Sequence, residues 1–256
     1  MARRAAPGQY VHVLAPRRLG LLLPALPIAG FDRADGRLDL HINSARPSPA
    51  DGLLAARPGD AVRLDGPLGR GFDIDARSRY LLLVADGDGL ARVRAVADEA
   101  VATGRRVTLL YGARTVAEVL PSSLLPDEVE YVVATADGTL GHRGSVLDLL
   151  PAYEAWADQC FAAGSAPLLS GLAALAKGRD ARMGVARLGR RQGRRRPEPG
   201  TDARRRAWLQ VALPLPAGCA LGVCLGCVAD GVDGSPRICR EGPAFAAAEL
   251  RWEEGP

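Results

Sequence analysis

GCALGVCLGCVADGVDGSPRICREGPAF, residues 218–245, holds four of the five cysteines of this 256-residue chain. Cys219, Cys224, Cys227 and Cys239 follow the spacing C-x4-C-x2-C-x11-C. The first three lie within nine residues, and neighbouring side chains of a regular helix or strand point apart. We therefore expect a loop that wraps around a ligand held by thiolates.

The glycines of this segment suit such a loop. Gly218, Gly222 and Gly226 stand before and between the first three cysteines. Glycine adopts backbone conformations that other residues avoid, so these positions permit sharp bends. They also let backbone N–H groups approach sulfur closely, as the ligand sulfurs of an iron–sulfur cluster require.

The cysteine spacing favours a [2Fe–2S] cluster over zinc. C-x4-C-x2-C followed by a distant cysteine is the plant-type [2Fe–2S] pattern. Structural zinc sites more often pair two C-x2-C knuckles, and this chain has one. Zinc and unligated thiols stay open as alternatives at this point. Cys160, outside the segment, is interpreted as a buried thiol.

Composition excludes several classes of protein. The apolar run 80–85 is far shorter than the roughly 20 residues of a membrane-spanning helix. The N-terminus lacks the apolar run of a secretory signal, so we expect a cytoplasmic protein with reduced thiols. Residues 179–206 contain eleven arginines and three acidic residues, so the positive net charge of the chain comes from this one segment. We interpret that segment as a linker or insertion; contact with RNA or another anionic partner is the alternative, and nucleic-acid binding is not expected.

The hydrophobic pattern predicts two architectures in sequence. Short strand-like runs at 8–16, 36–43 and 61–66, separated by Gly, Pro and Asp, predict a small β-barrel or sandwich. From residue 79 strands and helices alternate, which predicts a parallel sheet with helices on its faces. The expected strands are 80–86, 106–114, 130–137 and 159–164, and the expected helices follow at 90–104, 145–157 and 166–178.

These patterns divide the chain into four parts. The expected parts are a β-barrel at 1–76, an α/β domain at 77–178, the Arg-rich linker or insertion at 179–206 and a cluster domain at 207–256.

Four stretches of the chain together resemble one known family. It is the electron-transfer subunit of the NAD-linked, type B dihydroorotate dehydrogenase, a group of ferredoxin-reductase-like flavoproteins. The resemblance is most specific in the cysteine loop, down to Glu241, Gly242, Pro243 and Phe245. The matching stretches are PGQYVHVLAP at 7–16, ARPGDAVRLDGPLGRGF at 56–72, ATADGTLGHRGSVLDLL at 134–150 and the loop from 219 to 245.

The resemblance implies both a fold and a function. The implied fold is a flavin-binding β-barrel, an α/β domain that binds NAD, and a small C-terminal [2Fe–2S] domain whose cluster ligands are Cys219, Cys224, Cys227 and Cys239. The implied function is electron transfer between a nicotinamide nucleotide, FAD and the cluster. The electrons go to or come from a dihydroorotate dehydrogenase catalytic subunit of pyrimidine biosynthesis, in a heterotetramer. The cofactors supply this chemistry, so no residue of this chain is assigned a catalytic role.

The flavin motif of the family is altered in this chain. Its R-P-x-S pattern falls on residues 24–27, where the arginine that meets the FAD pyrophosphate is missing. Arg46 is a possible replacement. By position alone, the expected FAD contacts are Leu26, Pro27, His41, Ile42 and Asn43.

The nucleotide loop differs as well. Gly87 and Gly89 would let the backbone approach the nucleotide closely, and they are the expected NAD contacts. Asp86 and Asp88 add negative charge near a pyrophosphate, which Arg92 would partly offset. Two alternative functions follow: a homologue without flavin or NAD that acts as an iron–sulfur relay or structural partner, and a zinc-bound interaction module.

Overall fold

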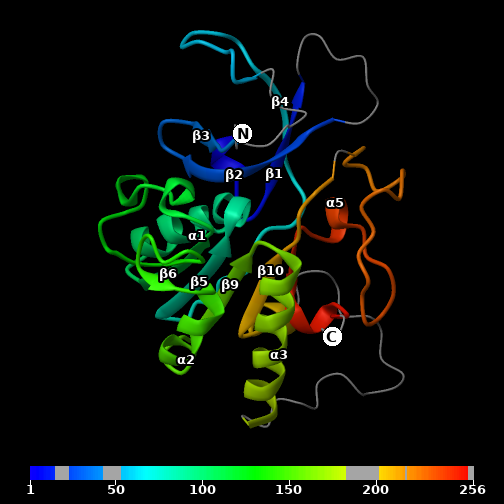
Figure 1. Ribbon diagram of the computed structural model, residues 1–256. Coiled ribbons are helices and arrows are strands. Elements are labelled where there is room, and N and C mark those ends of the chain that lie inside the picture. The colour runs from blue at the N-terminus through cyan, green and yellow to red at the C-terminus, as the bar shows by residue number, and fades with distance from the viewer. Residues whose placement is uncertain (15–22, 43–52, 183–201, 217, 253–256) are drawn as a thin grey trace.

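The computed structural model describes residues 1–14, 23–42, 53–182, 202–216 and 218–252 (Figure 1). A small N-terminal sheet lies above a larger α/β unit, and the C-terminal loops run along one side of both. The strands are β1 Tyr10–Leu14, β2 Ala25–Asp32, β3 Arg37–Leu40, β4 Arg63–Leu68, β5 Tyr80–Asp86, β6 Arg106–Ala113, β7 Val129–Thr135, β8 His142–Arg143, β9 Gln159–Ala163, β10 Leu209–Ala212 and β11 Ala244–Ala246. The α-helices are α1 Leu90–Ala102, α2 Leu150–Tyr153, α3 Ala166–Arg182, α4 Asp202–Arg205 and α5 Ile238–Glu241.

The N-terminal sheet is antiparallel, in the order β3-β2-β1-β4. It confirms the β-rich start predicted from the sequence, but β2 was not expected, because Pro24 and Pro27 argue against a strand. Pro27 lies opposite Tyr10 of β1, and the pairing of β2 with β3 begins only at Ile28. The missing N–H of Pro27 therefore interrupts no bond toward β3.

The larger sheet has seven strands, in the order β11-β10-β9-β5-β6-β7-β8. Every neighbouring pair is parallel except β10 and β11 at the edge. The predicted parallel sheet is confirmed, and it extends further along the chain than its expected end at residue 178. Since β10 and β11 belong to it, part of the stretch 207–256 completes the α/β sheet.

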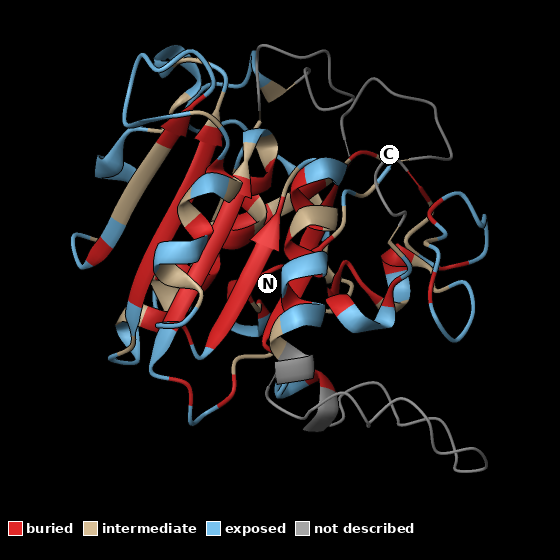
Figure 2. Cartoon of the chain, turned by 60° about the horizontal axis from the view of Figure 1, so that its bottom comes forward, coloured by how far each residue is buried: buried red, intermediate tan, exposed pale blue. Residues whose placement is uncertain are grey.

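Helices cover both faces of this sheet, and the strand sequence explains why (Figure 2). Along β5, Leu81 and Leu83 face one side and pack with α1, whereas Leu82 and Val84 face the other and pack with α2 and α3. All four are fully buried. A strand buried on both faces reads as a continuous apolar run, which is what residues 80–85 show.

The Arg-rich segment begins and ends in helices. α3 extends to Arg182, beyond the helix end expected at 178, and α4 begins at Asp202. Residues 183–201 lie outside the described residues. Arg204 of α4 is buried, stacks over Phe245 and pairs with Glu249 at 3.0 Å. The C-terminal end of the segment is therefore packed against the strand β11 and the turn that follows it.

The C-terminal loops also connect to the N-terminal sheet. Leu23 and Gly218 exchange two backbone hydrogen bonds of 3.3 Å, and the backbone N–H of Arg70 donates to the carbonyl of Gly242. The hydroxyl of Tyr10, in β1, donates to the carbonyl of Cys239 at 3.1 Å. The cysteine loop is thus tied to the N-terminal part of the chain. In the part of the chain that the structure describes, no helix is both long and apolar enough to cross a membrane.

Candidate functional site

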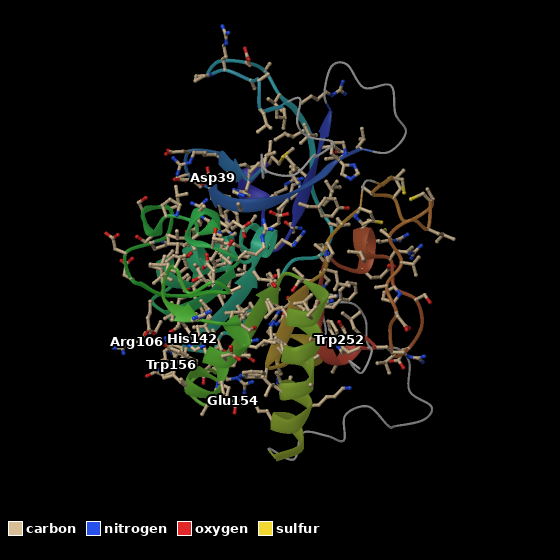
Figure 3. All side chains as sticks on the ribbon, viewed as in Figure 1. Asp39, Arg106, His142, Glu154, Trp156 and Trp252 are labelled. Carbon is tan, nitrogen blue, oxygen red and sulfur yellow. The ribbon has the colours of Figure 1, made fainter. Side chains whose placement is uncertain are left out.

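The four cysteines of the loop lie in two pairs. Cys219 and Cys224 interact through their side chains, and so do Cys227 and Cys239. The backbone N–H of Cys239 also points to the sulfur of Cys227, at 3.4 Å. The second pair is buried, whereas Cys224 is exposed. Figure 3 shows sulfur atoms on the C-terminal loops beside α5.

The sulfur of Cys219 is surrounded by backbone N–H groups. Donors from Cys224, Val223 and Leu221 lower the pKa of this thiol to about 6, because they stabilise the thiolate. The same environment suits a metal-bound thiolate, since iron–sulfur ligands accept hydrogen bonds from surrounding amides. Burial, and then the neighbouring Cys227, raise the pKa of Cys239 to about 11. Without a metal the thiol of Cys239 is therefore protonated near neutral pH.

The curvature of the loop comes from different residues than the sequence indicates. Gly222 has the expected positive φ of 73°, but Gly218 and Gly226 are not among the residues with positive φ. Ala220 and Leu225 take the left-handed conformation instead, each with φ of 55°. Non-glycine residues adopt this conformation at a cost of about 1–2 kcal/mol. The backbone is therefore strained at the residues next to Cys219 and Cys224. Bonds from the cysteines to a bound cluster would offset the energy of this strain.

The four thiols are the donor set that a two-iron cluster requires. Among the described residues, no three Cys, His, Asp or Glu side chains already stand close enough together to hold a metal ion. A [2Fe–2S] cluster uses four cysteines, two on each iron. The two thiol pairs, Cys219 with Cys224 and Cys227 with Cys239, would supply four such ligands.

A second candidate site lies at the carboxyl ends of the parallel strands. A cavity of ≈ 610 Å³ lies at these ends of the strands. Another cavity, of ≈ 650 Å³, lies at the opposite ends of β6 and β7. The residues of the first cavity are Asp86, Gly87, Asp88, Gly89, Arg92, Gly112, Ala113, Arg114, Glu118, Ala136, Gly144, Ser145, Val146, Gly164, Ser165 and Pro214. This edge is where open α/β sheets bind ligands.

Both glycines expected at the nucleotide site line this cavity. Gly87 has φ of +48°, in the left-handed region. Gly89 precedes α1, and a Cβ at this position would lie 1.9 Å from the carbonyl oxygen of Ala163. Only glycine lets the start of α1 approach β9 this closely. The 3-10 turn Gly87–Gly89 runs directly into α1, with the backbone N–H of Leu90 bonded to the carbonyl of Gly87, and neither the turn nor the helix has a side-chain cap. A helix start of this kind favours an anionic group such as a phosphate.

The two aspartates of this loop have other partners. Asp86 accepts hydrogen bonds from the backbone N–H of Ser165, at 2.6 Å, and from its hydroxyl. Its carboxylate therefore joins the ends of β5 and β9. Arg92 is half-buried; desolvation lowers its pKa, and the nearby Asp88 and Asp86 oppose that effect. This arrangement agrees with the expected offset of negative charge by Arg92, while Ser165 is a contact that the sequence did not indicate.

The expected flavin positions are separated in the structure. Leu26 is buried with Val11 and Ile28 in the core of the N-terminal sheet. Pro27 lines a cavity of ≈ 30 Å³ with Tyr10 and Arg92. That volume is enough for a water molecule but not for a flavin ring. The expected FAD contacts at Leu26 and Pro27 therefore have no cavity of flavin size beside them among the described residues.

His41 and Ile42 lie at a different cavity, of ≈ 430 Å³, between the N-terminal sheet and the start of α1. Its volume falls in the range of small-molecule sites. Asn43 and Arg46 lie outside the described residues. Of the other two histidines, His12 is buried and burial lowers its pKa, and His142 lies 3.6 Å from Asp148.

Comparison with known proteins supports the resemblance stated above. The model of the iron–sulfur cluster binding domain of dihydroorotate dehydrogenase B matches residues 217–251. The dihydroorotate dehydrogenase B (NAD+) electron transfer subunit of Desulforamulus reducens is 28% identical over 99% of this chain and 89% of its own length. That of Bacillus caldolyticus is 29% identical over 95% of this chain and 86% of its own length.

Solved structures share the fold. An NADH-dependent reduced ferredoxin-NADP oxidoreductase, described for flavin-based electron bifurcation, aligns with a TM-score of 0.73 at 21% identity, over 99% of this chain and 82% of that one. A ferredoxin reductase of carbazole 1,9a-dioxygenase aligns with a TM-score of 0.50 at 25% identity, over 63% of this chain and 52% of that one. The ferredoxin-reductase-like fold and the relationship to these electron transfer subunits are therefore confirmed.

Proposed function

We propose that this relative of the dihydroorotate dehydrogenase B electron transfer subunits passes electrons between a nicotinamide nucleotide, FAD and a [2Fe–2S] cluster. The electrons are exchanged with a separate dihydroorotate dehydrogenase catalytic subunit in the biosynthesis of pyrimidines. The observation that carries this proposal is the cysteine loop, which combines paired thiols with backbone donors and matches the iron–sulfur domain model. We assign Cys219, Cys224, Cys227 and Cys239 as its ligands.

The nucleotide is assigned to the cavity at the carboxyl edge of the larger sheet. Gly87, Gly89 and the uncapped start of α1 support binding of a pyrophosphate there. When bound, FAD accepts or donates a hydride and passes electrons on singly, which a one-electron cluster requires. We propose that FAD lies along the N-terminal sheet near His41 and Ile42, with the adjoining segment 43–52 outside the described residues.

The catalytic subunit is expected to dock at the tip of the cysteine loop. Leu221, Val223 and Leu225 are 69%, 73% and 65% exposed and surround Cys224, the exposed thiol. Large apolar side chains grouped on a surface commonly mark a protein interface. A partner there approaches the cluster closely enough for electron transfer. We propose a cytoplasmic heterotetramer of two such pairs.

A second function is favoured by two observations. The arginine of the flavin motif is absent and the cavity at Pro27 holds ≈ 30 Å³. These features favour a protein that keeps the cluster without flavin and acts as an iron–sulfur relay or as a structural partner of the catalytic subunit.

The deciding experiment is an absorbance spectrum of the anaerobically purified chain, with iron, sulfide and extracted flavin quantified. Two irons and one FAD per chain support the full electron-transfer function. Two irons without flavin support the relay. A colourless protein with stoichiometric zinc overturns both and identifies a zinc-bound interaction module.

The partner is tested separately by co-purification from the native host. A complex with a flavin-bearing catalytic subunit is expected, and light scattering gives its stoichiometry. A chain that purifies alone as a monomer contradicts the proposed heteromer.

A further inference from the structure

Two charged side chains stand at the far end of the nucleotide cavity. Arg114 and Glu118 line it at the end of β6, and Gly87 and Gly89 line it at the start of α1. The same arginine and glutamate also line the neighbouring cavity that contains His41. A ligand whose phosphates lie at α1 and which extends toward β6 therefore meets this pair.

Arg114 and Glu118 form an ion pair at the surface, with their side chains 79% and 36% exposed. The guanidinium Nε of Arg114 donates to Oε1 of Glu118 at 2.7 Å, and its Nη2 donates to the same oxygen. The backbone N–H of Arg114 donates to Oε2 at 3.2 Å. Hydrogen bonding to Glu118 raises the pKa of Arg114. One carboxylate thus contacts both the side chain and the backbone of the arginine.

The turn that carries Glu118 is fixed to the nucleotide loop. Tyr111 is buried, and its hydroxyl lies 3.2 Å from the carbonyl of Glu118 and 3.3 Å from that of Gly87. At the start of the turn, the backbone N–H of Val116 donates to the hydroxyl of Thr139 at 2.9 Å. These bonds hold the backbone of Glu118 at a set position relative to the glycines.

Arg114 and Glu118 lie where dinucleotide-binding units contact the ribose of the adenosine half. β5, α1 and β6 form a β-α-β unit with parallel strands, and β6 ends one residue before Arg114. In dinucleotide-binding units, groups after the second strand meet the ribose 2′ position of the adenosine half. A carboxylate there accepts a hydrogen bond from a 2′-hydroxyl, and a free arginine there binds a 2′-phosphate.

We infer that Glu118 makes this site selective for NAD(H) over NADP(H), an inference that rests on the proposed nucleotide function. The carboxylate of Glu118 accepts hydrogen bonds from the guanidinium of Arg114, which would otherwise be able to bind the 2′-phosphate. Its own negative charge repels that phosphate. Selectivity therefore combines an attraction to the 2′-hydroxyl with a repulsion of the competitor.

The test uses the full chain as purified and measures binding by calorimetry. The probes are NADH, NADPH, adenosine 5′-monophosphate and adenosine 2′,5′-bisphosphate. The wild-type chain is expected to bind NADH and adenosine 5′-monophosphate at least about tenfold more tightly than their counterparts that carry a 2′-phosphate, as one unfavourable charge contact predicts.

Glu118→Gln is the test variant. It removes the charge and loosens the grip on Arg114, so binding of adenosine 2′,5′-bisphosphate is expected to improve by about tenfold. The double variant Glu118→Gln/Arg114→Leu is expected to lose that gain. Glu128→Gln makes the same change of charge on an exposed residue at the opposite end of the sheet, and should leave the preference unchanged.

The outcomes distinguish failure of the selectivity from failure of the proposed nucleotide function. Wild-type chain that binds none of the four probes overturns both the nucleotide function and the selectivity. Wild-type chain that binds NADH and NADPH equally, or a Glu118→Gln variant with the wild-type preference, overturns the selectivity alone. Retained NADH binding by Glu118→Gln shows that the variant is folded.

Discussion

The four thiols of the cysteine loop differ in their surroundings. Cys224 is exposed beside apolar side chains, Cys219 accepts several backbone N–H bonds, and Cys227 and Cys239 are buried against the larger sheet. The exposed thiol faces the surface proposed for the partner. The buried pair anchors the loop, so the cluster is expected to stabilise the C-terminal fold as well as to carry electrons.

Cys224→Ser is predicted to abolish the cluster. A serine hydroxyl is a poor ligand for the irons of a cluster that thiolates hold, and the loop has little core of its own. Iron content and visible absorbance should fall to background, and the midpoint of unfolding should decrease. Cys160→Ala is the matched control, because Cys160 is buried within β9 away from the loop. Full cluster absorbance in Cys224→Ser would contradict the ligand assignment.

A second prediction concerns two carboxylates where α1 meets the N-terminal sheet. Asp39, labelled in Figure 3, and Asp98 both border Gly30, where an added Cβ would lie 2.9 Å and 3.2 Å from their respective Oδ2 atoms. Arg94 pairs with Asp39 at 3.6 Å. Burial raises the pKa of Asp98, and Asp39 adds to the effect while Arg94 opposes it. Asp98 is therefore harder to ionise in the folded chain than in the unfolded one.

The sign of the pH dependence follows from that shift. Below the ordinary pKa of 3.8 Asp98 is protonated in both states and costs nothing. As the pH rises from there through the raised pKa, the unfolded state ionises first and folding loses free energy. Asp98→Asn should thus stabilise the chain at neutral pH, and the gain should vanish toward about pH 4. Urea unfolding across this range measures it, with the exposed Asp127→Asn as control; a gain that persists in acid would refute the assignment.

At the scale of elements, the start of α1 packs closely against the ends of β5 and β9. Gly89 is in the helical region with φ of −61°, so its importance is steric and not conformational. The carbonyl of Ala163 occupies the space of a Cβ there. Asp86 and Ser165 join the same two strand ends. The nucleotide cavity is thus shaped by backbone contacts between α1 and β9.

Gly89→Ala is predicted to destabilise the chain by about 1–3 kcal/mol, because the methyl group forces α1 away from β9. Nucleotide binding should weaken as well, since the helix start moves. Denaturant unfolding and calorimetry measure the two effects. The control is Gly178→Ala in α3, where an added Cβ meets open space and alanine favours the helix by up to about 1 kcal/mol. Equal stabilities of the two variants would contradict the steric explanation.

At the scale of the whole molecule, three parts meet at Tyr10. Tyr10 is buried in β1, its hydroxyl bonds to the backbone of the cysteine loop, and its side chain belongs to the core on the α3 face of the larger sheet. Burial, together with the nearby Cys239, Cys227 and Cys219, raises the pKa of its hydroxyl. This residue therefore links the N-terminal sheet, the larger sheet and the cluster loop.

Tyr10→Phe is predicted to lower the free energy of unfolding by about 1 kcal/mol, the usual contribution of one hydrogen bond. The loop around Cys239 should also become looser, so a chelator should remove iron faster than from the wild-type chain. Tyr153→Phe removes a longer and exposed hydroxyl contact, 3.4 Å from Glu130, and serves as control. If Tyr10→Phe loses iron no faster than this control, the proposed link to the loop is wrong.

The sequence by itself determined the features that depend on neighbouring residues. The spacing of the four cysteines, the two glycines before α1 and the apolar run of β5 are local patterns with few structural solutions. They indicated the cluster loop, the nucleotide edge and the buried parallel strand. The order of the β-rich and α/β parts followed from the change in hydrophobic period near residue 79.

The tertiary structure alone decided which distant residues meet. Nothing local in 207–256 indicates that β10 and β11 extend the larger sheet, because strand pairing joins segments far apart in the chain. The proline-containing β2 was missed for the same reason: its place depends on β1 and β3. Leu26 lies in the core of the N-terminal sheet, and Asp86 meets Ser165 across 79 positions. Packing and long-range hydrogen bonds decide such positions, and no local sequence pattern encodes them.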